Sequence, residues 1–240
     1  MPSRRQGAGR KARAAAIVVA AGEGRRFGRK GGKPFSLLGG KPLLFYCLKA
    51  LEISPEIERV VLVVRKDALK KCLAFVRRSG FKKVDAVVAG GRRRQDSVLA
   101  GLAFVGDSKF VLVHDAARPF LDRGLVAKTL AAARKNGAAI AAIPVTDTVK
   151  KVAGRSIQKT IPREGLWLAQ TPQVFRTRTL EEAFRRWPSA RTATDDASVV
   201  RSCGGRVSVV EGDPANIKIT IPSDLALAES LLRFRKRPWE

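Results

Sequence analysis

The sequence predicts an α/β domain with a doubly wound, mostly parallel sheet from which a β-hairpin arm projects. From Ala15 to Pro144, short apolar runs alternate with segments of helical periodicity, which is the pattern of parallel strands joined by crossover helices. The first run is apolar at every position, as in a strand that is covered on both faces. After Val145 the alternation stops, and two β-type runs flank a glycine turn.

The elements are predicted in order along the chain. Strands are expected at 15–20, 59–64, 84–88, 110–114 and 138–144, and helices at 43–53, 67–79, 96–104 and 122–136. Asp67 is the expected N-cap of the second helix, and Gly80 and Gly137 follow helix ends because glycine adopts the left-handed conformation easily. The later segments are helices at 179–187 and 195–203, strands at 206–210 and 217–220, and a last helix from a Ser223 cap to Phe234.

The interrupted region, 145–171, is interpreted as the arm. Its runs at 148–152 and 157–161 surround a turn at Ala153–Arg155. A lone hairpin cannot bury both of its faces, so we expect a second subunit to cover it and the protein to be a homodimer. The rest forms one domain over residues 16–234, between a solvated basic tail at 1–15 and a basic end at 235–240.

The composition limits the kinds of partner. The chain has 47 Lys and Arg against 21 Asp and Glu, a net charge of +26, which favours anionic partners such as nucleic acid, a membrane surface or phosphorylated metabolites. No apolar run approaches the roughly 20 residues that span a bilayer. Three scattered cysteines and one histidine provide neither a disulfide framework nor a zinc cluster, and a cytoplasmic location fits them.

A glycine-rich loop follows the first predicted strand. It differs from the dinucleotide-binding motif because Phe27 stands at the third glycine position, and from the P-loop because Pro34 follows Lys33. Glycines at the carboxyl end of a parallel strand nevertheless let backbone N–H groups approach phosphates. Arg26 and Lys33 add positive charge, so the loop is a candidate phosphate site.

Asp115 follows the fourth predicted strand, at the same edge of the sheet. A carboxylate at this place can hold Mg²⁺ together with the oxygens of a triphosphate. An aspartate at a strand end is often only a helix cap, but its position beside the glycine loop favours the metal. Arg118 offers a forked donor for a phosphate, and His114 is interpreted as a packed or orienting residue.

Six segments occur in an order that resembles one enzyme family. They are Ala20-Ala21-Gly22-x-Gly24-x-Arg26, Gly90-Gly91-x-x-Arg94-x-x-Ser97-Val98, Val113 to Pro119, Gln170 to Gln173, Thr194 to Ser198, and Asn216 to Thr220. Together they resemble the 2-C-methyl-D-erythritol 4-phosphate cytidylyltransferases of the non-mevalonate isoprenoid pathway. The resemblance extends over roughly 16–232 and implies a Rossmann-like nucleotidyltransferase fold.

The resemblance also implies the roles of individual residues. CTP would lie on Ala20, Ala21, Gly22, Gly24, Gly91 and Ser97. Arg26 and Lys33 would stabilise charge on the phosphorus under attack, and Asp115 would hold Mg²⁺. The phosphate of the acceptor would be held by Arg118, Thr148, Thr171, Arg163 and Lys218, of which the last two orient its attacking oxygen. Similar enzymes are homodimers in which the arm of one subunit helps to complete the acceptor site of the other.

Two other functions remain as alternatives. Ribitol-5-phosphate cytidylyltransferases share the glycine loop, the aspartate and the arm, but the segments at 96–102 and 167–170 look closer to the methylerythritol enzymes. A nucleic-acid-binding protein would account for the charge. Against that alternative, Lys and Arg are dispersed, only 6% of residues are aromatic, and no motif of a known nucleic-acid-binding module appears. The sequence therefore favours small phosphorylated substrates.

Overall fold

The computed structural model describes residues 13–22, 24, 27 and 32–234. Most of the expected basic tail, the residue Arg26 and the end at 235–240 lie outside these residues. The first strand, β1 (Ala14–Ala20), includes Ala14, which the sequence analysis had assigned to the tail, and Ala15, where the predicted tail and strand overlapped. The tail was predicted too long because short alanines next to a basic segment carry little strand signal.

The core is a seven-stranded sheet with the order β11-β7-β10-β6-β1-β4-β5. Its remaining members are β4 (Ile57–Val64), β5 (Val84–Ala89), β6 (Phe110–Asp115), β7 (Ala138–Pro144), β10 (Trp167–Arg176) and β11 (Ser208–Glu211). All neighbours pair in parallel except β10, which runs antiparallel to β6 and β7. The predicted doubly wound, mostly parallel sheet is confirmed.

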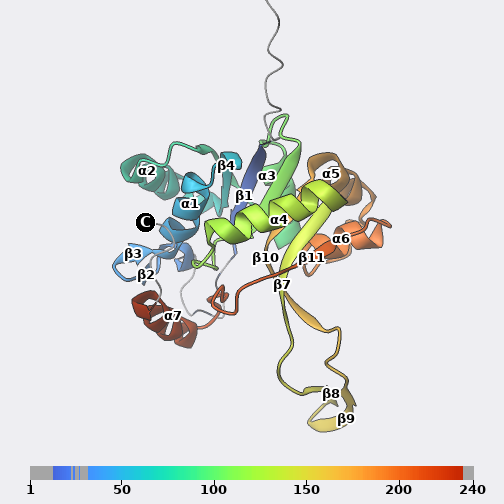
Figure 1. The fold of residues 1–240 in the computed structure, drawn as a ribbon. Helices are drawn as coiled ribbons and strands as arrows, with labels where there is room; N and C mark the ends of the chain where they lie inside the picture. The colour runs from blue at the N-terminus through green and yellow to red at the C-terminus, as the bar shows by residue number, and fades with distance from the viewer. Residues whose placement is uncertain (1–12, 23, 25–26, 28–31, 235–240) are drawn as a thin grey trace, which may run out of the picture.

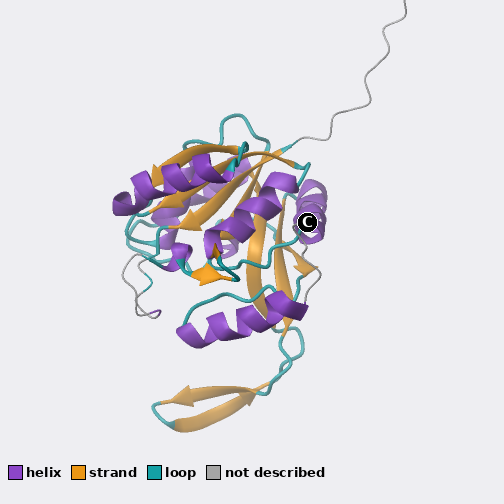
Figure 2. Ribbon diagram, turned by 90° about the vertical axis from the view of Figure 1, so that its left-hand side faces the viewer, coloured by secondary structure: helices purple, strands orange, loops and turns teal. Residues whose placement is uncertain are grey.

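Helices cover each face of this sheet (Figures 1 and 2). On one face lie α1 (Leu43–Ile53), α2 (Leu69–Ser79) and α4 (Arg123–Asn136), and on the other lie α3 (Arg94–Leu102), α5 (Thr177–Arg186) and α6 (Asp196–Ser202). Strand β1 supplies alternate residues to these two layers, Ala16 and Val18 to the first and Ala15 and Ile17 to the second. This double coverage explains why the strand reads as an uninterrupted apolar run.

Helix ends agree with the predicted signals in some places and not in others. Gly80 follows α2 with φ 68°, and the carboxylate of Asp122 caps α4 by accepting from the Leu125 N–H at 2.9 Å. Asp67 is not an N-cap. It lies in a short 3-10 turn, η3 (Lys66–Ala68), before α2, and its carboxylate accepts from the Arg65 side chain.

Helix α7 (Pro222–Phe234) closes a third, smaller apolar cluster. Ala228 of α7 and Phe27 of the glycine loop pack there with Leu38 and Leu43, beside the short strands β2 (Leu37–Leu38) and β3 (Lys41–Pro42) and the 3-10 turn η2 (Lys33–Phe35). The Asp224 carboxylate, not Ser223, accepts from the backbone N–H groups of Thr220 and Ile221. Phe27, which stands where the dinucleotide-binding motif has its third glycine, is therefore a core residue.

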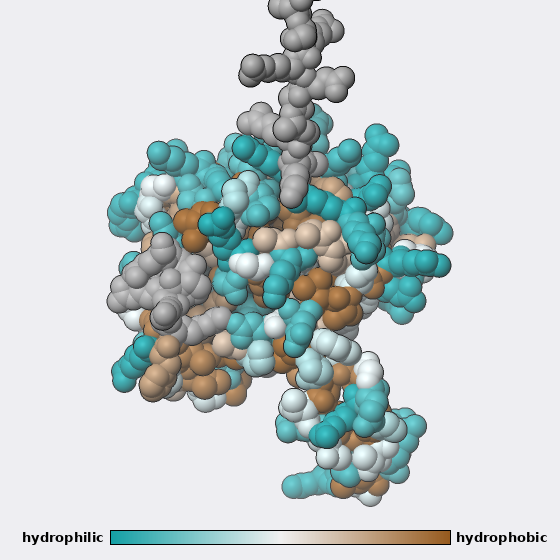
Figure 3. Space-filling view, in the orientation of Figure 1, coloured by the Kyte–Doolittle hydropathy of each residue, from teal (hydrophilic) through white to brown (hydrophobic). Residues whose placement is uncertain are grey.

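The arm is the hairpin β8 (Val149–Ala153) and β9 (Ser156–Ile161), which extends away from the body (Figures 1 and 3). Gly154 in its turn has φ 57°, as the predicted turn requires. The predicted arm was too long, because Trp167–Thr171 belong to β10 of the main sheet. The register of β10 against β7 is interrupted between Ala169 and Gln173, which masks its strand pattern.

The segment 217–220 is not a strand, contrary to the prediction. Ile219 is buried and its N–H donates to the Ala117 carbonyl at 2.9 Å. The alternation of apolar and polar residues at 217–220 therefore marks a loop held to the body by Ile219, not a strand. Within the described residues, no helix has the length and apolar character needed to cross a bilayer.

Candidate active site

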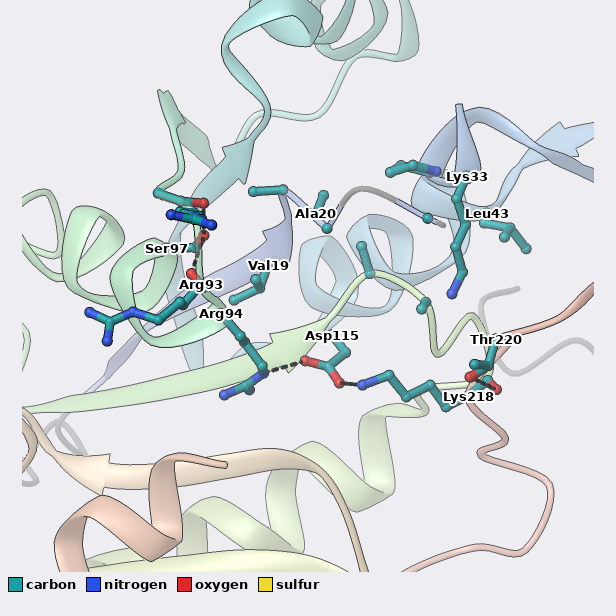
Figure 4. A pocket seen from close by; sticks show the side chains of 18 residues that line it. Val19, Ala20, Lys33, Leu43, Arg93, Arg94, Ser97, Asp115, Lys218 and Thr220 are labelled. Atoms are coloured by element: carbon teal, nitrogen blue, oxygen red, sulfur yellow. Dashed lines mark hydrogen bonds and ion pairs between the residues drawn. The ribbon is translucent and has the colours of Figure 1, made fainter. Parts of the chain in front are cut away.

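A cavity of about 560 Å³ opens at the edge of the sheet where β6, β1 and β5 end (Figure 4). The loops that follow β1, β5 and β6 form most of its wall, and the segment before α7 completes it. Its lining includes Ala20, Ala21, Gly22, Gly24, Lys33, Gly91, Arg92, Arg94, Ser97, Asp115 and Lys218. All six residues that the sequence analysis assigned to CTP therefore line one cavity, together with Lys33, Asp115 and Lys218. Arg26 lies outside the described residues.

The glycine loop turns sharply after β1. Gly24 has φ 65°, a left-handed conformation that favours glycine, and its carbonyl accepts from the Phe27 N–H at 2.8 Å. Lys33 follows at the start of η2, with its ammonium 5.8 Å from the centre of the Phe27 ring. Phe27 is thus anchored in the apolar cluster, and Lys33, whose ammonium lies near its ring, lines the cavity.

The second glycine motif joins the loop after β5 to α3. A Cβ on Gly90 would lie 2.5 Å from the Cβ of Ala21 and 2.7 Å from Ser97 Oγ, so this position has no room for a side chain. Ser97 is 2% exposed, and its hydroxyl donates to the Arg93 carbonyl at 3.2 Å. Close packing between the two loops therefore sets the shape of the cavity wall.

The three consecutive arginines that open α3 have different surroundings. Arg92 is exposed and lines the cavity. Arg93 forms a capping box with Asp96 and donates to the Ser189 carbonyl at 2.5 Å. Arg94 points to the cavity floor and joins two carboxylates. All three line the cavity, but the run divides into an exposed side chain, a helix cap and a bridge between two carboxylates.

Asp115, the last residue of β6, lies between two cations (Figure 4). Its Oδ1 accepts from Arg94 Nε at 3.0 Å and its Oδ2 accepts from Lys218 Nζ at 2.7 Å. Burial by itself would raise the pKa of Asp115, but the charges of Arg94 and Lys218 outweigh it and hold this pKa well below its usual range. The carboxylate is therefore ionised across the physiological pH range.

Arg94 continues the chain of charges to a second carboxylate. Its Nη1 donates to Asp196 Oδ2 at 2.8 Å, and the Asp196 side chain is 1% exposed. Burial by itself would lower the pKa of Arg94, but the negative charges of Asp196 and Asp115 raise it by a larger amount. The pKa of Arg94 therefore lies above its usual value. Sequence reasoning placed Arg94 and Asp196 in family-like segments without giving either a role. Their separation by about a hundred positions hid the pairing.

A chain of buried hydrogen bonds through Thr171 and His114 holds the backbone of Asp115 in place. The Asp115 N–H donates to Thr171 Oγ1 at 3.1 Å, and Thr171 Oγ1 lies 3.0 Å from His114 Nδ1. His114 Nε2 lies 3.0 Å from the Arg118 carbonyl, so we assign the ring proton to Nε2 and let the Thr171 hydroxyl donate to Nδ1. Burial lowers the pKa of His114 to about 4. His114 is thus a neutral packed residue, as the sequence analysis interpreted it.

The five residues expected at the acceptor phosphate are not gathered in one place. Lys218 lines the cavity, whereas Thr148 and Arg163 are exposed near the base of the arm. Arg118 Nη1 donates to the Asn216 carbonyl at 2.6 Å, and Thr171 is 4% exposed with its hydroxyl bonded on both sides. In a single chain, Arg118 and Thr171 brace the loop after β6 rather than face the cavity.

The donor set limits the kind of metal that the cavity could hold. Among the described residues, no three His, Cys, Asp or Glu side chains gather as a metal site. In the part of the chain that the structure describes, Asp115 is the one carboxylate in the cavity lining, and it lies between cations. One carboxylate with oxygens from a bound triphosphate is the pattern by which proteins hold Mg²⁺, so the donor set fits a metal that arrives with its nucleotide.

Glycine-rich backbone and positive side chains therefore line, with the Asp115 carboxylate, a cavity at the carboxyl edge of a mostly parallel sheet. This arrangement suits phosphate binding and charge neutralisation, and it defines an α/β nucleotidyltransferase.

The chain belongs to the 2-C-methyl-D-erythritol 4-phosphate cytidylyltransferase family, whose model matches residues 14–234. A relative of that name from Dehalococcoides mccartyi is 46% identical over 219 residues, which cover 91% of this chain and 95% of the relative. The crystal structure of the enzyme of that name from Thermus thermophilus has a TM-score of 0.76 at 38% identity, covering 92% of this chain and 99% of that one. The 4-diphosphocytidyl-2C-methyl-D-erythritol synthase of Anaerococcus prevotii has a TM-score of 0.81 at 30% identity, covering 92% and 96%.

Proposed function

We propose that the protein transfers CMP from CTP to 2-C-methyl-D-erythritol 4-phosphate, which gives 4-diphosphocytidyl-2-C-methyl-D-erythritol and pyrophosphate in non-mevalonate isoprenoid biosynthesis. The observation that carries the proposal is the family match over 14–234, within which six expected CTP residues line one cavity. The high identity to relatives that bear this name supports the choice of acceptor.

The chemistry is an in-line displacement at the α-phosphorus of CTP. A phosphate oxygen of the acceptor forms the new P–O bond while the bond to pyrophosphate breaks and its electron pair leaves with the pyrophosphate. A phosphate dianion needs no base, so the protein has to position two anions and neutralise their charge. Lys33 at the cavity wall, together with Arg26, stabilises charge on the phosphorus under attack.

Asp115 is the proposed magnesium ligand. Magnesium would neutralise charge on the phosphates of CTP, and Asp115 Oδ2, which accepts from the partly exposed cavity cation Lys218, is the oxygen that would bind it. Arg94 keeps the other oxygen occupied and so fixes the carboxylate plane. In this proposal Arg118 and Thr171 act by holding the loop that carries Asp115, through the hydrogen bonds described above.

We further propose a homodimer in which the arm of one chain completes the acceptor site of the other. On the arm, Val152 is 51% and Ile157 is 62% exposed, so the hairpin offers apolar surface to a partner (Figure 3). Arg163 and Thr148 lie near its base, away from the cavity of their own chain. The unpaired thiols of Cys47, Cys72 and Cys203 suit the reducing cytoplasm that we propose as the location.

A pyrophosphate-release assay tests the function. We expect Mg²⁺-dependent release with CTP and methylerythritol phosphate, and much weaker release with ATP, GTP or UTP. Ribitol 5-phosphate is the critical second acceptor, because the enzymes that use it share the same motifs. Equal or faster turnover of ribitol 5-phosphate would overturn the proposed acceptor, and the Asp115→Asn variant provides the inactive baseline.

A further inference from the structure

The two oxygens of Asp115 are bound by two cations of different character. Oδ1 accepts from the guanidinium of Arg94 and Oδ2 from the ammonium of Lys218, which approach the carboxylate from opposite sides (Figure 4). The proposed reaction, however, asks Asp115 to hold magnesium and Lys218 to bind the acceptor. A metal ion on Oδ2 would lie beside the Lys218 ammonium on the same oxygen, and two positive charges at that distance repel each other.

Arg94 cannot be the cation that leaves. It stands at the start of α3, only 23% of its side chain is exposed, and a second ion pair ties it to Asp196. Removing Arg94 from Asp115 would leave a buried carboxylate partly unpaired and would disturb the pair with Asp196, both of which are costly in a protein interior. The bond between Arg94 and Oδ1 is therefore a fixed part of the site.

Lys218 has the opposite properties. Its side chain is 42% exposed and holds Oδ2 through one ammonium on a flexible stem. The backbone on either side is anchored, because the Ile219 N–H donates to the Ala117 carbonyl at 2.9 Å and the Asn216 carbonyl accepts from Arg118. The side chain of Lys218 is therefore less restrained than its backbone, and it lies in the cavity that it lines.

We propose that Lys218 is an exchangeable counter-ion of Asp115: its ammonium occupies Oδ2 in the free enzyme, leaves when magnesium and CTP enter, and then binds the phosphate of the acceptor. The inference rests on the proposed function and deepens it. A dication and an ammonium on one carboxylate oxygen repel each other, which drives the ammonium away. Arg94 keeps Oδ1 neutralised throughout, so the carboxylate stays in place while its partner changes.

The exchange makes Lys218 a competitor of the metal. Magnesium binds to the wild-type site only after an ion pair has opened, whereas in a Lys218→Gln variant Oδ2 is free from the start. The factor by which magnesium tightens CTP binding should therefore be larger in the variant, by about five-fold if the pair has the strength of a partly exposed ion pair. A residue that simply binds the nucleotide would show no such gain.

Titration calorimetry with CTP, in magnesium or in EDTA and without acceptor, measures this factor in the absence of turnover. The matched control is Arg92→Gln, which removes one positive charge from the same cavity wall at a side chain with no ion pair to Asp115. Lys218→Met serves as a second variant, and thermal unfolding confirms that each protein is folded. We expect the magnesium factor to rise in the two Lys218 variants and to stay near the wild-type value in Arg92→Gln.

Three outcomes would overturn the exchange. If the factor is unchanged in the Lys218 variants, the ammonium does not compete for Oδ2. If it rises equally in Arg92→Gln, the effect comes from the general field of the cavity and not from this pair. If magnesium fails to tighten CTP binding to the wild-type protein, the proposed metal site itself is wrong and the exchange falls with it. The pyrophosphate assay distinguishes a failure of the exchange from a failure of the proposed function: if the exchange alone is wrong, the wild-type protein still releases pyrophosphate from CTP and methylerythritol phosphate.

Discussion

Asp115 shows at the scale of single residues how this protein accommodates buried charge. Lys218, Asp115, Arg94 and Asp196 form a line of alternating sign, so that every carboxylate faces a cation. A buried carboxylate that is unpaired would be costly and would bind a proton instead. The pairing keeps the pKa of Asp115 low and its oxygens in fixed positions, which a binding site for a metal and an anion requires.

Lys33 provides a prediction about catalysis. If its ammonium stabilises negative charge that builds on the phosphorus under attack, Lys33→Ala should lower kcat by about 10²–10³ and change KM for CTP much less. Steady-state kinetics with CTP and methylerythritol phosphate measure the two constants separately. Lys41 is a matched control, since it is an exposed lysine that stacks 4.4 Å from the centre of the Phe45 ring and does not line the cavity. A change in KM alone would make Lys33 a ground-state binder.

His114 provides a prediction about stability and pH. Burial lowers its pKa from 6.5 to about 4, so between these values the unfolded chain binds more protons than the folded one. The free energy of unfolding should be at its full value above about pH 6.5 and should fall as the pH decreases toward about 4, by on the order of 3 kcal/mol. Urea unfolding across this range measures the slope. His114 is the only histidine, so His114→Gln should remove most of that slope, and an equal slope in the variant would contradict the assignment.

At the scale of elements, the junction between the glycine loop and α3 determines the shape of the cavity. Gly90 packs against Ala21, and Gly101 of α3 packs against Ile17 of β1, where an added Cβ would lie 2.7 Å from Ile17 Cγ2. The helix therefore approaches the first strand closely along its length. This approach brings Arg94, at the start of α3, to the end of β6 where Asp115 lies.

Two glycines separate packing from ligand binding at this junction. Gly90→Ala should destabilise the fold by about 1–3 kcal/mol, because its Cβ has no room beside Ala21. An added Cβ on Gly22 meets no described residue within 4 Å, so the stability of Gly22→Ala should stay near the wild-type value while its CTP affinity falls, if phosphates lie against the backbone there. Thermal unfolding and calorimetry distinguish these effects. Equal stability of the two variants would contradict the packing account.

At the scale of the whole molecule, the arm and the body belong to different environments. Strands β8 and β9 pair with each other and are exposed along most of their length, while the sheet of the body is covered on both faces. Hairpins of this kind are only marginally stable alone in water. A second copy of the chain would supply the missing cover, and two-fold symmetry would make the contact reciprocal.

Mixing two inactive variants tests the shared site. Asp115→Asn disables the cavity of its own chain, and Arg163→Ala removes an arm residue that we propose acts on the partner. One site of each mixed dimer then keeps both residues, so random exchange should recover about a quarter of wild-type activity. The control pairs Asp115→Asn with Lys33→Ala, which lie in one cavity and should not complement each other. No recovery despite demonstrated exchange, or a fully active monomer, would place the site within one chain.

Much of the fold could be predicted because it depends on local patterns. The buried strands read as apolar runs, Gly80 ends α2 as a left-handed residue, and 138–144 was predicted with the bounds of β7. The residues assigned to CTP came from the family resemblance, and they line one cavity because the carboxyl ends of parallel strands share one edge of the sheet. Strand β10 was not predicted, because its pairing with β7 is interrupted between Ala169 and Gln173. Its first residues were therefore assigned to the arm.

The sequence by itself determined the fold class, the family and the edge of the sheet at which the site lies, because strand burial and glycine loops leave short-range signals. Only the tertiary structure decided which charges pair. Arg94 meets Asp115 and Asp196 across 21 and 102 positions, and Lys218 meets Asp115 across 103. Long-range ion pairs leave no periodicity in a sequence, since any exposed or buried Lys and Asp look alike in one dimension. Their partners are set by the packing of helices on the sheet, which depends on the whole chain at once.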